Sequence, residues 1–182
     1  MGVGASQYER ELRSLLEGEQ AALRHYARYL APEQRRTLDR LERGPFLVVR
    51  AAGSHGFDLV AMRAGFAFPI EAKASGEEVI RFSSASGRMT DQLHEHLEAA
   101  RRGGLVVLYA YRRLGSRTGE PWRVFTPETD NHTHGRVEAL RRHLPAIERT
   151  KDGNGVLRWE NGLPLSEFLE RLFHLFDPDA GA

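Results

Sequence analysis

Two neighbouring apolar runs, each bounded by charged residues, constrain the fold of this chain most strongly. Residues 58–62 (Asp-Leu-Val-Ala-Met) and 66–73 (Phe-Ala-Phe-Pro-Ile-Glu-Ala-Lys) are separated by only three residues, one of them glycine. Short apolar runs joined in this way predict two antiparallel strands. Side chains alternate between the two faces of a strand, so Glu71 and Lys73 share a face, and antiparallel pairing brings Asp58 beside Glu71. The sequence therefore predicts two carboxylates and an ammonium at one rim of a sheet.

These three side chains form a chemically useful set. Carboxylate oxygens are the hard ligands that Mg²⁺ and Mn²⁺ prefer, and a carboxylate inside an apolar strand is costly to bury without a partner. Lysine is rare in this chain, because only Lys73 and Lys151 among 26 basic residues are lysine. Since lysine and arginine are not interchangeable in a reactive pocket, a lysine at this point favours a specific chemical role.

Length and composition set broad limits. A chain of 182 residues is expected to form one domain, residues 1–182, with a substantial core. The net charge of +1 gives no global sign of a polyanionic partner, and the absence of cysteine excludes disulfides, thiolate nucleophiles and cysteine-bound zinc. No signal peptide or long apolar run is present, so we expect a soluble, cytoplasmic protein with no membrane partner. We also expect no small-molecule substrate.

The rest of the chain is predicted to alternate between helices and strands. The expected helices are residues 6–16, 19–30, 32–43, 89–102, 136–149 and 165–176. The further expected strands are residues 46–49, 79–82, 105–111, 122–125 and 156–159. This order predicts an α/β fold, with a central mixed β-sheet flanked by helices.

Four segments together resemble the archaeal-type Holliday-junction resolvases, which are small members of the PD-(D/E)xK nuclease superfamily. The segments are residues 8–12 (YEREL), 49–54 (VRAAGS), 58–61 (DLVA) and 70–73 (IEAK). The likeness covers residues 4–17 and 46–126 in order, with a weaker echo at 156–172, and it implies a restriction-endonuclease-like core. Two parts depart from the family pattern: an inserted helical hairpin at about 18–44 and an additional C-terminal segment at about 128–182.

The resemblance implies a Mg²⁺-dependent DNA endonuclease, with Mn²⁺ as a substitute. The expected enzyme is a homodimer that resolves four-way junctions in branched DNA by paired symmetric nicks, leaving 5′-phosphate and 3′-hydroxyl ends. The implied catalytic residues are Glu9, Asp58, Glu71 and Lys73, and the implied metal ligands are Glu9, Asp58, Glu71 and the carbonyl of Ala72. Arg50 and Ser54 fall on positions that the family places near the phosphate path, and Arg10 falls on a basic position of the same helix as Glu9, so the resemblance implies DNA contacts for all three. Basic residues flanking the site add further expected DNA contacts, namely Arg81, Arg88, Arg112 and Arg113.

Each assignment has a structural alternative. Glu9 also completes a helix capping box with Ser6, and Asp58 also suits a turn before a strand. For the whole chain, three alternatives stay open: a nuclease for other branched, damaged or duplex DNA, a DNA-binding module with a vestigial site, and a partner-binding protein with an accidental motif. The 18–44 insertion is expected to lie over the cleft, to form a dimer contact or simply to lengthen the scaffold.

Overall fold

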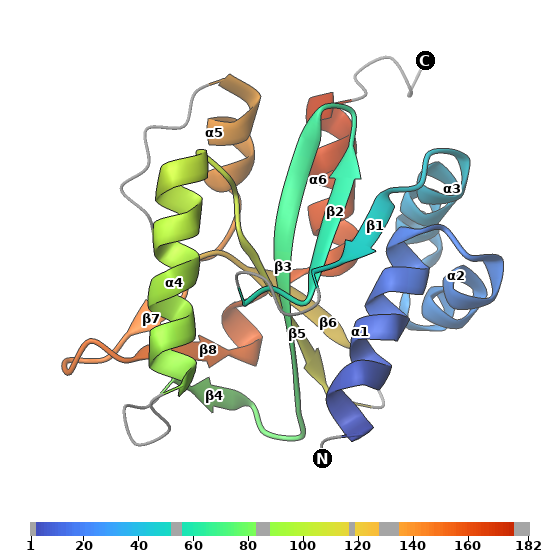
Figure 1. Ribbon diagram of the computed structural model, residues 1–182. Helices are drawn as coiled ribbons and strands as arrows, with labels where there is room; N and C mark the ends of the chain where they lie inside the picture. Colours follow the sequence, from blue (N-terminus) through green and yellow to red (C-terminus); the bar gives the residue numbers. More distant parts are fainter. Residues whose placement is uncertain (1–2, 52–55, 83–87, 117–118, 128–134, 177–182) are drawn as a thin grey trace.

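The computed structural model describes residues 3–51, 56–82, 88–116, 119–127 and 135–176, without the side chains of residues 3–6, 88–90 and 176. A six-stranded mixed sheet forms the centre, in the order β1-β2-β3-β5-β6-β9, and a three-stranded sheet, β4-β8-β7, lies beside it (Figure 1). The prediction of an α/β fold with a mixed sheet flanked by helices is confirmed. The strands are β1 (Leu47–Arg50), β2 (Leu59–Arg63), β3 (Phe66–Ser75), β4 (Val79–Arg81), β5 (Leu108–Arg113), β6 (Trp122–Phe125), β7 (Glu148–Arg149), β8 (Gly155–Arg158) and β9 (Leu163–Pro164).

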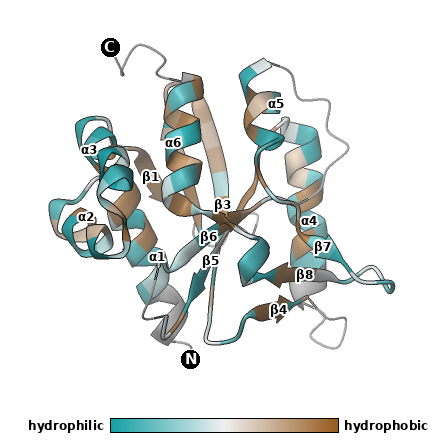
Figure 2. Ribbon diagram, turned by 180° about the vertical axis from the view of Figure 1, so that it is seen from behind, coloured by the Kyte–Doolittle hydropathy of each residue, from teal (hydrophilic) through white to brown (hydrophobic). Residues whose placement is uncertain are grey.

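Helices cover both faces of the large sheet. They are α1 (Val3–Leu16), α2 (Gln20–Tyr26), α3 (Arg35–Arg43), α4 (Arg88–Gly103), α5 (Gly135–Arg141) and α6 (Leu165–Phe176). One apolar cluster joins α1, α2, α3 and α6 to one face of the sheet. A second cluster joins α4 and the small sheet to the other face. Hydrophobic and hydrophilic residues alternate along α6 (Figure 2), as expected of a helix that packs on one side only.

A tight turn sets the register of β2 against β3. Ala64 and Gly65 both have positive φ angles, 50° and 83°, the combination required by the two-residue turn that suits the twist of a hairpin. The strands pair antiparallel, with Leu59 opposite Ile70. One residue earlier, the amide of Asp58 donates a hydrogen bond to the carbonyl of Ile70 at 3.1 Å. The turn therefore fixes the position of Asp58 next to Glu71.

The two faces of β3 have different surroundings. Ile70 belongs to the cluster under α1 and α6, whereas Glu71 stands opposite Tyr109 of β5, whose ring belongs to the cluster under α4. Side chains alternate along a strand, so Lys73 lies on the same face as Glu71. The predicted common face of these two side chains is thus the α4 side of the sheet.

The predicted helical hairpin is present as α2 and α3, each with a short 3₁₀ segment beside it. It packs against α1 and α6, at the opposite side of the molecule from α4 (Figure 1). The Tyr26 hydroxyl donates a hydrogen bond to Glu120 at 2.8 Å, and the Arg40 guanidinium donates one to the carbonyl of Phe173 at 3.2 Å. The hairpin therefore extends the α1–α6 layer and does not cover the face that carries Glu71.

The prediction of a helix at residues 136–149 is wrong for its second half. Helix α5 ends at Arg141, and the chain then reaches the sheet, where Thr126 and Ala146 form a parallel bridge. Pro145 explains this difference, because proline has no N–H to donate and disfavours helical geometry in the residue before it. Residues 148–149 instead form β7 of the small sheet.

Candidate active site

Three elements bring polar groups to one rim of the large sheet. Asp58 precedes β2, Glu71 and Lys73 come from the middle of β3, and Gln92 comes from α4. The Ala72 amide donates to Asp58 Oδ2 at 2.8 Å, which orients this carboxylate. Lys73 Nζ donates to Glu71 Oε1 at 2.5 Å and to Gln92 Oε1 at 3.2 Å. The three residues expected to share a rim are therefore together in the fold.

The two carboxyl groups are in an unfavourable environment for negative charge. Glu71 is only 3 % exposed, and its Oε2 has no hydrogen-bond partner within the described part of the chain. Burial is the main cause that raises the pKa of Glu71 to about 7, with the neighbouring Asp58 raising it further and Lys73 opposing both. Burial also raises the pKa of Asp58, whose carboxyl lies within hydrogen-bonding reach of Glu71. Two ionised carboxylates at such a distance repel each other, so the pair requires a proton or a cation between them.

Glu9 lies near this pair but is bound elsewhere. Its Oε2 accepts a hydrogen bond from Arg50 Nη2 at 3.2 Å. Burial, followed by the charge of Asp58, raises the pKa of Glu9, while Arg50 lowers it. Within the described residues no group of three or more His, Cys, Asp or Glu side chains is arranged to hold one metal ion. The metal role of Glu9 stays a prediction. Because Glu9 is paired with Arg50, an indirect contact with the metal through a water molecule fits its position better than direct coordination.

The donor set around Asp58 and Glu71 fits a hard divalent cation. Both side chains are carboxylates, and the buried Glu71 Oε2 lacks any donor from the described residues. Mg²⁺ and Mn²⁺ commonly bind to one or two carboxylates and complete their coordination with water and substrate oxygens. The carbonyl of Ala72, expected as a third ligand, stays a prediction.

The expected DNA-contacting residues are placed in different environments. Arg10 and Arg50 are exposed beside Glu9, and Arg81 is exposed on β4. Arg112 is largely buried and binds both oxygens of Glu11, at 2.9 and 2.8 Å, so in this arrangement it serves the contact between β5 and α1. Arg113 pairs with Glu78 at 2.7 Å. Ser54 and the side chain of Arg88 lie outside the described residues, and the other expected contacts stay predictions.

Gln92 is a site residue that sequence reasoning did not find. Its amide contacts Glu71, Lys73 and the carbonyl of Gly56. Within the sequence it is one of several polar residues on an amphipathic helix, and no local pattern separates it from its neighbours. Only the packing of α4 against β3 places it at the rim.

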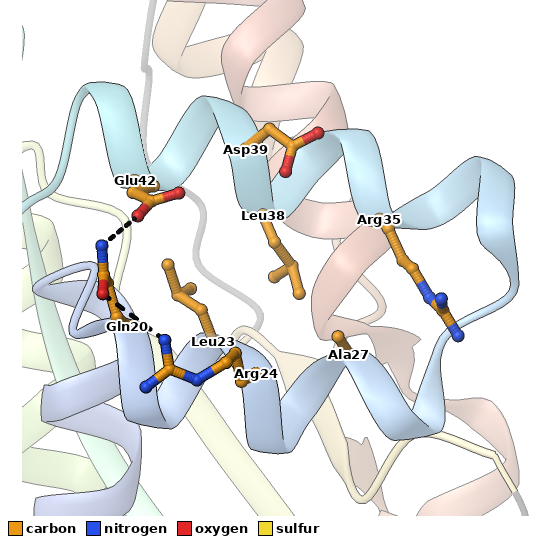
Figure 3. Close-up of a pocket in the computed structure, with 8 residues that line it drawn as sticks. All are labelled: Gln20, Leu23, Arg24, Ala27, Arg35, Leu38, Asp39 and Glu42. Carbon is orange, nitrogen blue, oxygen red and sulfur yellow. Dashed lines mark hydrogen bonds between the residues drawn. The ribbon is translucent and has the colours of Figure 1, made fainter.

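A second hollow on the surface, between α2 and α3 and away from the candidate site, lacks the features of a reactive site. It encloses about 270 Å³, between Leu23 and Leu38 at the base and polar residues at the edge (Figure 3). The polar groups bind one another, because Gln20 donates to Glu42 at 3.1 Å and accepts from Arg24 at 3.4 Å.

Comparison with known proteins finds a limited structural similarity. No family model matches the sequence, and no curated protein is significantly similar to it. Among solved structures, the fold is similar to the 1.6 Å resolution structure of Hjc from Archaeoglobus fulgidus, a Holliday junction resolvase from an archaeal hyperthermophile. The match has a TM-score of 0.47 and 21 % sequence identity, and it covers 80 % of this chain and 96 % of that chain. Within the described residues, no helix is long and apolar enough to cross a membrane.

Proposed function

We propose that this protein is a metal-dependent endonuclease of branched DNA that resolves four-way junctions. The observation that carries the proposal is the pair of neighbouring carboxylates at the half-buried Asp58 and the buried Glu71. Glu71 Oε2 has no hydrogen-bond partner among the described residues, and the Lys73 ammonium lies beside Glu71. Such a cluster is expensive to bury, and the sequence around each of its members resembles the motif of one nuclease family. A purely structural cluster would be expected to satisfy every buried oxygen.

Each residue of the site has a chemical role in this proposal. Asp58 and Glu71 hold Mg²⁺ or Mn²⁺, which supplies positive charge to activate water and to stabilise the phosphate during the displacement. Lys73 orients the water or donates to the phosphate oxygens as their negative charge increases. Glu9 binds the metal ion through a water molecule. Arg50, which is exposed and pairs with Glu9, exchanges that contact for a phosphate group of the DNA. Hydrolysis would leave 5′-phosphate and 3′-hydroxyl ends.

We propose that the enzyme acts on the junction as a homodimer, because the substrate has two-fold symmetry. A four-way junction offers two equivalent strands, and a two-fold pair of sites can nick both of them. A groove of about 720 Å³ lies between α4 and the β1–β3 face of the sheet, and its lining includes the apolar Val60 and Ala67 as well as charged residues of α4. On the neighbouring edge strand, Leu47 is 64 % exposed. Exposed apolar surface of this kind often marks an interface, and it supports the proposal of a second copy.

The test is a cleavage assay with end-labelled DNA substrates. A four-way junction, a fork and a linear duplex are each incubated with the protein and Mg²⁺, with an EDTA control and with Asp58→Asn as the matched variant. We expect paired symmetric nicks in the junction only, and no nicks with EDTA or with the variant. Equal cutting of all three substrates would favour a broader nuclease, and binding without any cutting would favour a vestigial site. A protein that neither binds nor cuts DNA would refute the proposal.

A further inference from the structure

The Gln92 side chain on α4 connects all parts of the candidate site. Its Nε2 donates to Glu71 Oε1 at 3.0 Å and to the carbonyl of Gly56 at 2.9 Å. Its Oε1 accepts a hydrogen bond from Lys73 Nζ at 3.2 Å. One amide thus contacts both charged residues of β3 and the segment that leads into Asp58.

These contacts permit one orientation of the amide. A glutamine amide has two donor hydrogens and one acceptor oxygen, and here the donors meet a carboxylate and a carbonyl while the oxygen meets an ammonium. The reverse orientation would place NH₂ against the ammonium of Lys73 and C=O against Glu71. Both contacts would be repulsive, so the network itself determines the orientation. Both donor hydrogens of the amide are already engaged, which leaves none to donate to a phosphate oxygen.

The next turn of α4 carries His96, which packs against the same segment before Asp58. The His96 ring stacks on Phe57 with a centroid separation of 4.0 Å, and its Nδ1 lies 2.7 Å from the Tyr109 hydroxyl. Burial lowers the pKa of His96 to about 4, so the ring is neutral near pH 7. Gly56 has a φ of 76°, and a Cβ there would lie 3.0 Å from His96 Nε2. The chain before Asp58 is therefore held between two residues of α4, Gln92 and His96, one helical turn apart.

We propose that Gln92 is the positioning residue of the site: it holds the Lys73 ammonium and the Glu71 carboxylate in fixed directions and ties them to the segment before Asp58. The inference rests on the proposed nuclease function for its catalytic meaning, but the positioning itself is independent of it. An ammonium has three donors. Two of them bind Glu71 and Gln92, and the third has no acceptor among the described residues. With Glu71 and Gln92 holding the ammonium, one N–H of Lys73 is left for a phosphate oxygen or a water molecule to accept.

The chain offers a direct measure of this positioning, because it contains only two lysines. Lys73 has a side chain that is 20 % exposed, whereas Lys151 lies exposed in a turn and serves as an internal reference. Limiting acetic anhydride followed by peptide mass spectrometry gives the ratio of acetylation at Lys73 to that at Lys151. This ratio reports how tightly the Lys73 ammonium is held, and it requires neither metal nor DNA.

The decisive variant is Gln92→Met, which preserves length and helix propensity but removes all three hydrogen bonds. We expect the Lys73 to Lys151 ratio to rise several-fold and kcat for junction cleavage to fall about 10- to 100-fold, as is typical when a residue that orients ligands is lost. The junction Kd should stay unchanged, because both N–H donors of Gln92 are engaged within the protein and none is left for a DNA phosphate. Gln20→Met on α2 is the matched control, since Gln20 binds only Arg24 and Glu42, and it should change none of these quantities.

A second variant separates the two halves of the amide. Gln92→Glu keeps an acceptor for Lys73 but loses the donors to Glu71 and Gly56, so Lys73 should stay protected while cleavage still falls. This variant also covers the case in which Gln92→Met fails to fold.

The possible outcomes distinguish this inference from the proposed function. If the wild type cuts no DNA, the proposed function fails, but the acetylation ratio still tests Gln92. The inference is overturned if Gln92→Met folds and has the same ratio as Gln20→Met, or if Gln92→Glu cleaves the junction as fast as the wild type.

Discussion

Glu71 and Glu120 are both buried carboxylates, yet their surroundings are opposite. Glu120, which is 6 % exposed, accepts hydrogen bonds from the Tyr26 hydroxyl at 2.8 Å and from the amide and hydroxyl of Ser166 at 2.9 and 2.5 Å. Glu71 is 3 % exposed and has one oxygen with no donor within the described residues. The carboxyl of Asp58 also lies beside it.

The difference shows what each carboxylate contributes. Glu120 connects α2 of the helical hairpin with the start of α6, where the positive end of the helix dipole also favours a negative group. Both of its oxygens accept hydrogen bonds from buried donors, so neither is left without a partner. The site around Glu71 is incomplete, which costs stability in the absence of a cation. A satisfied carboxylate holds the fold together, whereas an unsatisfied one is available for chemistry.

The largest expected effect is the loss of cleavage in Glu71→Gln. An amide is a weaker ligand for Mg²⁺ than a carboxylate, so we expect junction cleavage to fall on the order of 10³-fold or more, equivalent to several kcal/mol of transition-state stabilisation. Junction binding should persist, because the proposed phosphate contacts come from arginines elsewhere. Single-turnover cleavage and a binding isotherm measure the two effects. Normal cutting by this variant would mean that the metal site is misplaced.

The same substitution at Glu120 should have the reverse outcome. Glu120→Gln places an NH₂ donor against other donors in a buried network, so we expect the free energy of unfolding to decrease by about 3 kcal/mol. Cleavage well below the unfolding midpoint should be unchanged. Urea denaturation and the junction assay measure both quantities, with Tyr26→Phe as a milder variant that loses a single hydrogen bond. An activity loss in Glu120→Gln without a loss of stability would contradict the distinction between the two carboxylates.

The pH dependence of stability gives the smallest effect. The pKa of Glu71 is about 7 in the folded protein against an ordinary value of 4.5, so the folded state binds more protons between these values. The corresponding stability is fully present below about pH 4.5 and is lost as the pH rises through about 7. Relative to Glu71→Gln, the wild type should lose up to about 3 kcal/mol between pH 4.5 and 8 without metal.

Urea denaturation of both proteins in EDTA checks this expectation. Added Mg²⁺ should restore part of the lost stability at high pH, because it binds the ionised carboxylates. Identical pH profiles for the wild type and Glu71→Gln would indicate that Glu71 titrates normally.

Much of the candidate site follows from local sequence. The alternation of residues 66–73 and the short turn before them place Glu71 and Lys73 on one face and Asp58 at the neighbouring strand. These features depend on backbone geometry over a few residues, and the antiparallel pairing of β2 and β3 agrees with them. The helix expected at 136–149 shows the limit of this reasoning, because its second half does not form: Pro145 and a long-range bridge with the sheet prevent it.

The sequence by itself determined β2 and β3, their antiparallel pairing and the three charged residues at the rim, because each of these depends on the two-residue period of a strand and on one tight turn. Only the tertiary structure decided that Gln92 reaches this rim, that the helical hairpin packs against α1 and α6, and that Glu120 is satisfied while Glu71 is not. These outcomes depend on which distant surfaces pack together, and a local pattern of polar and apolar residues carries no information about the partner of a buried polar atom.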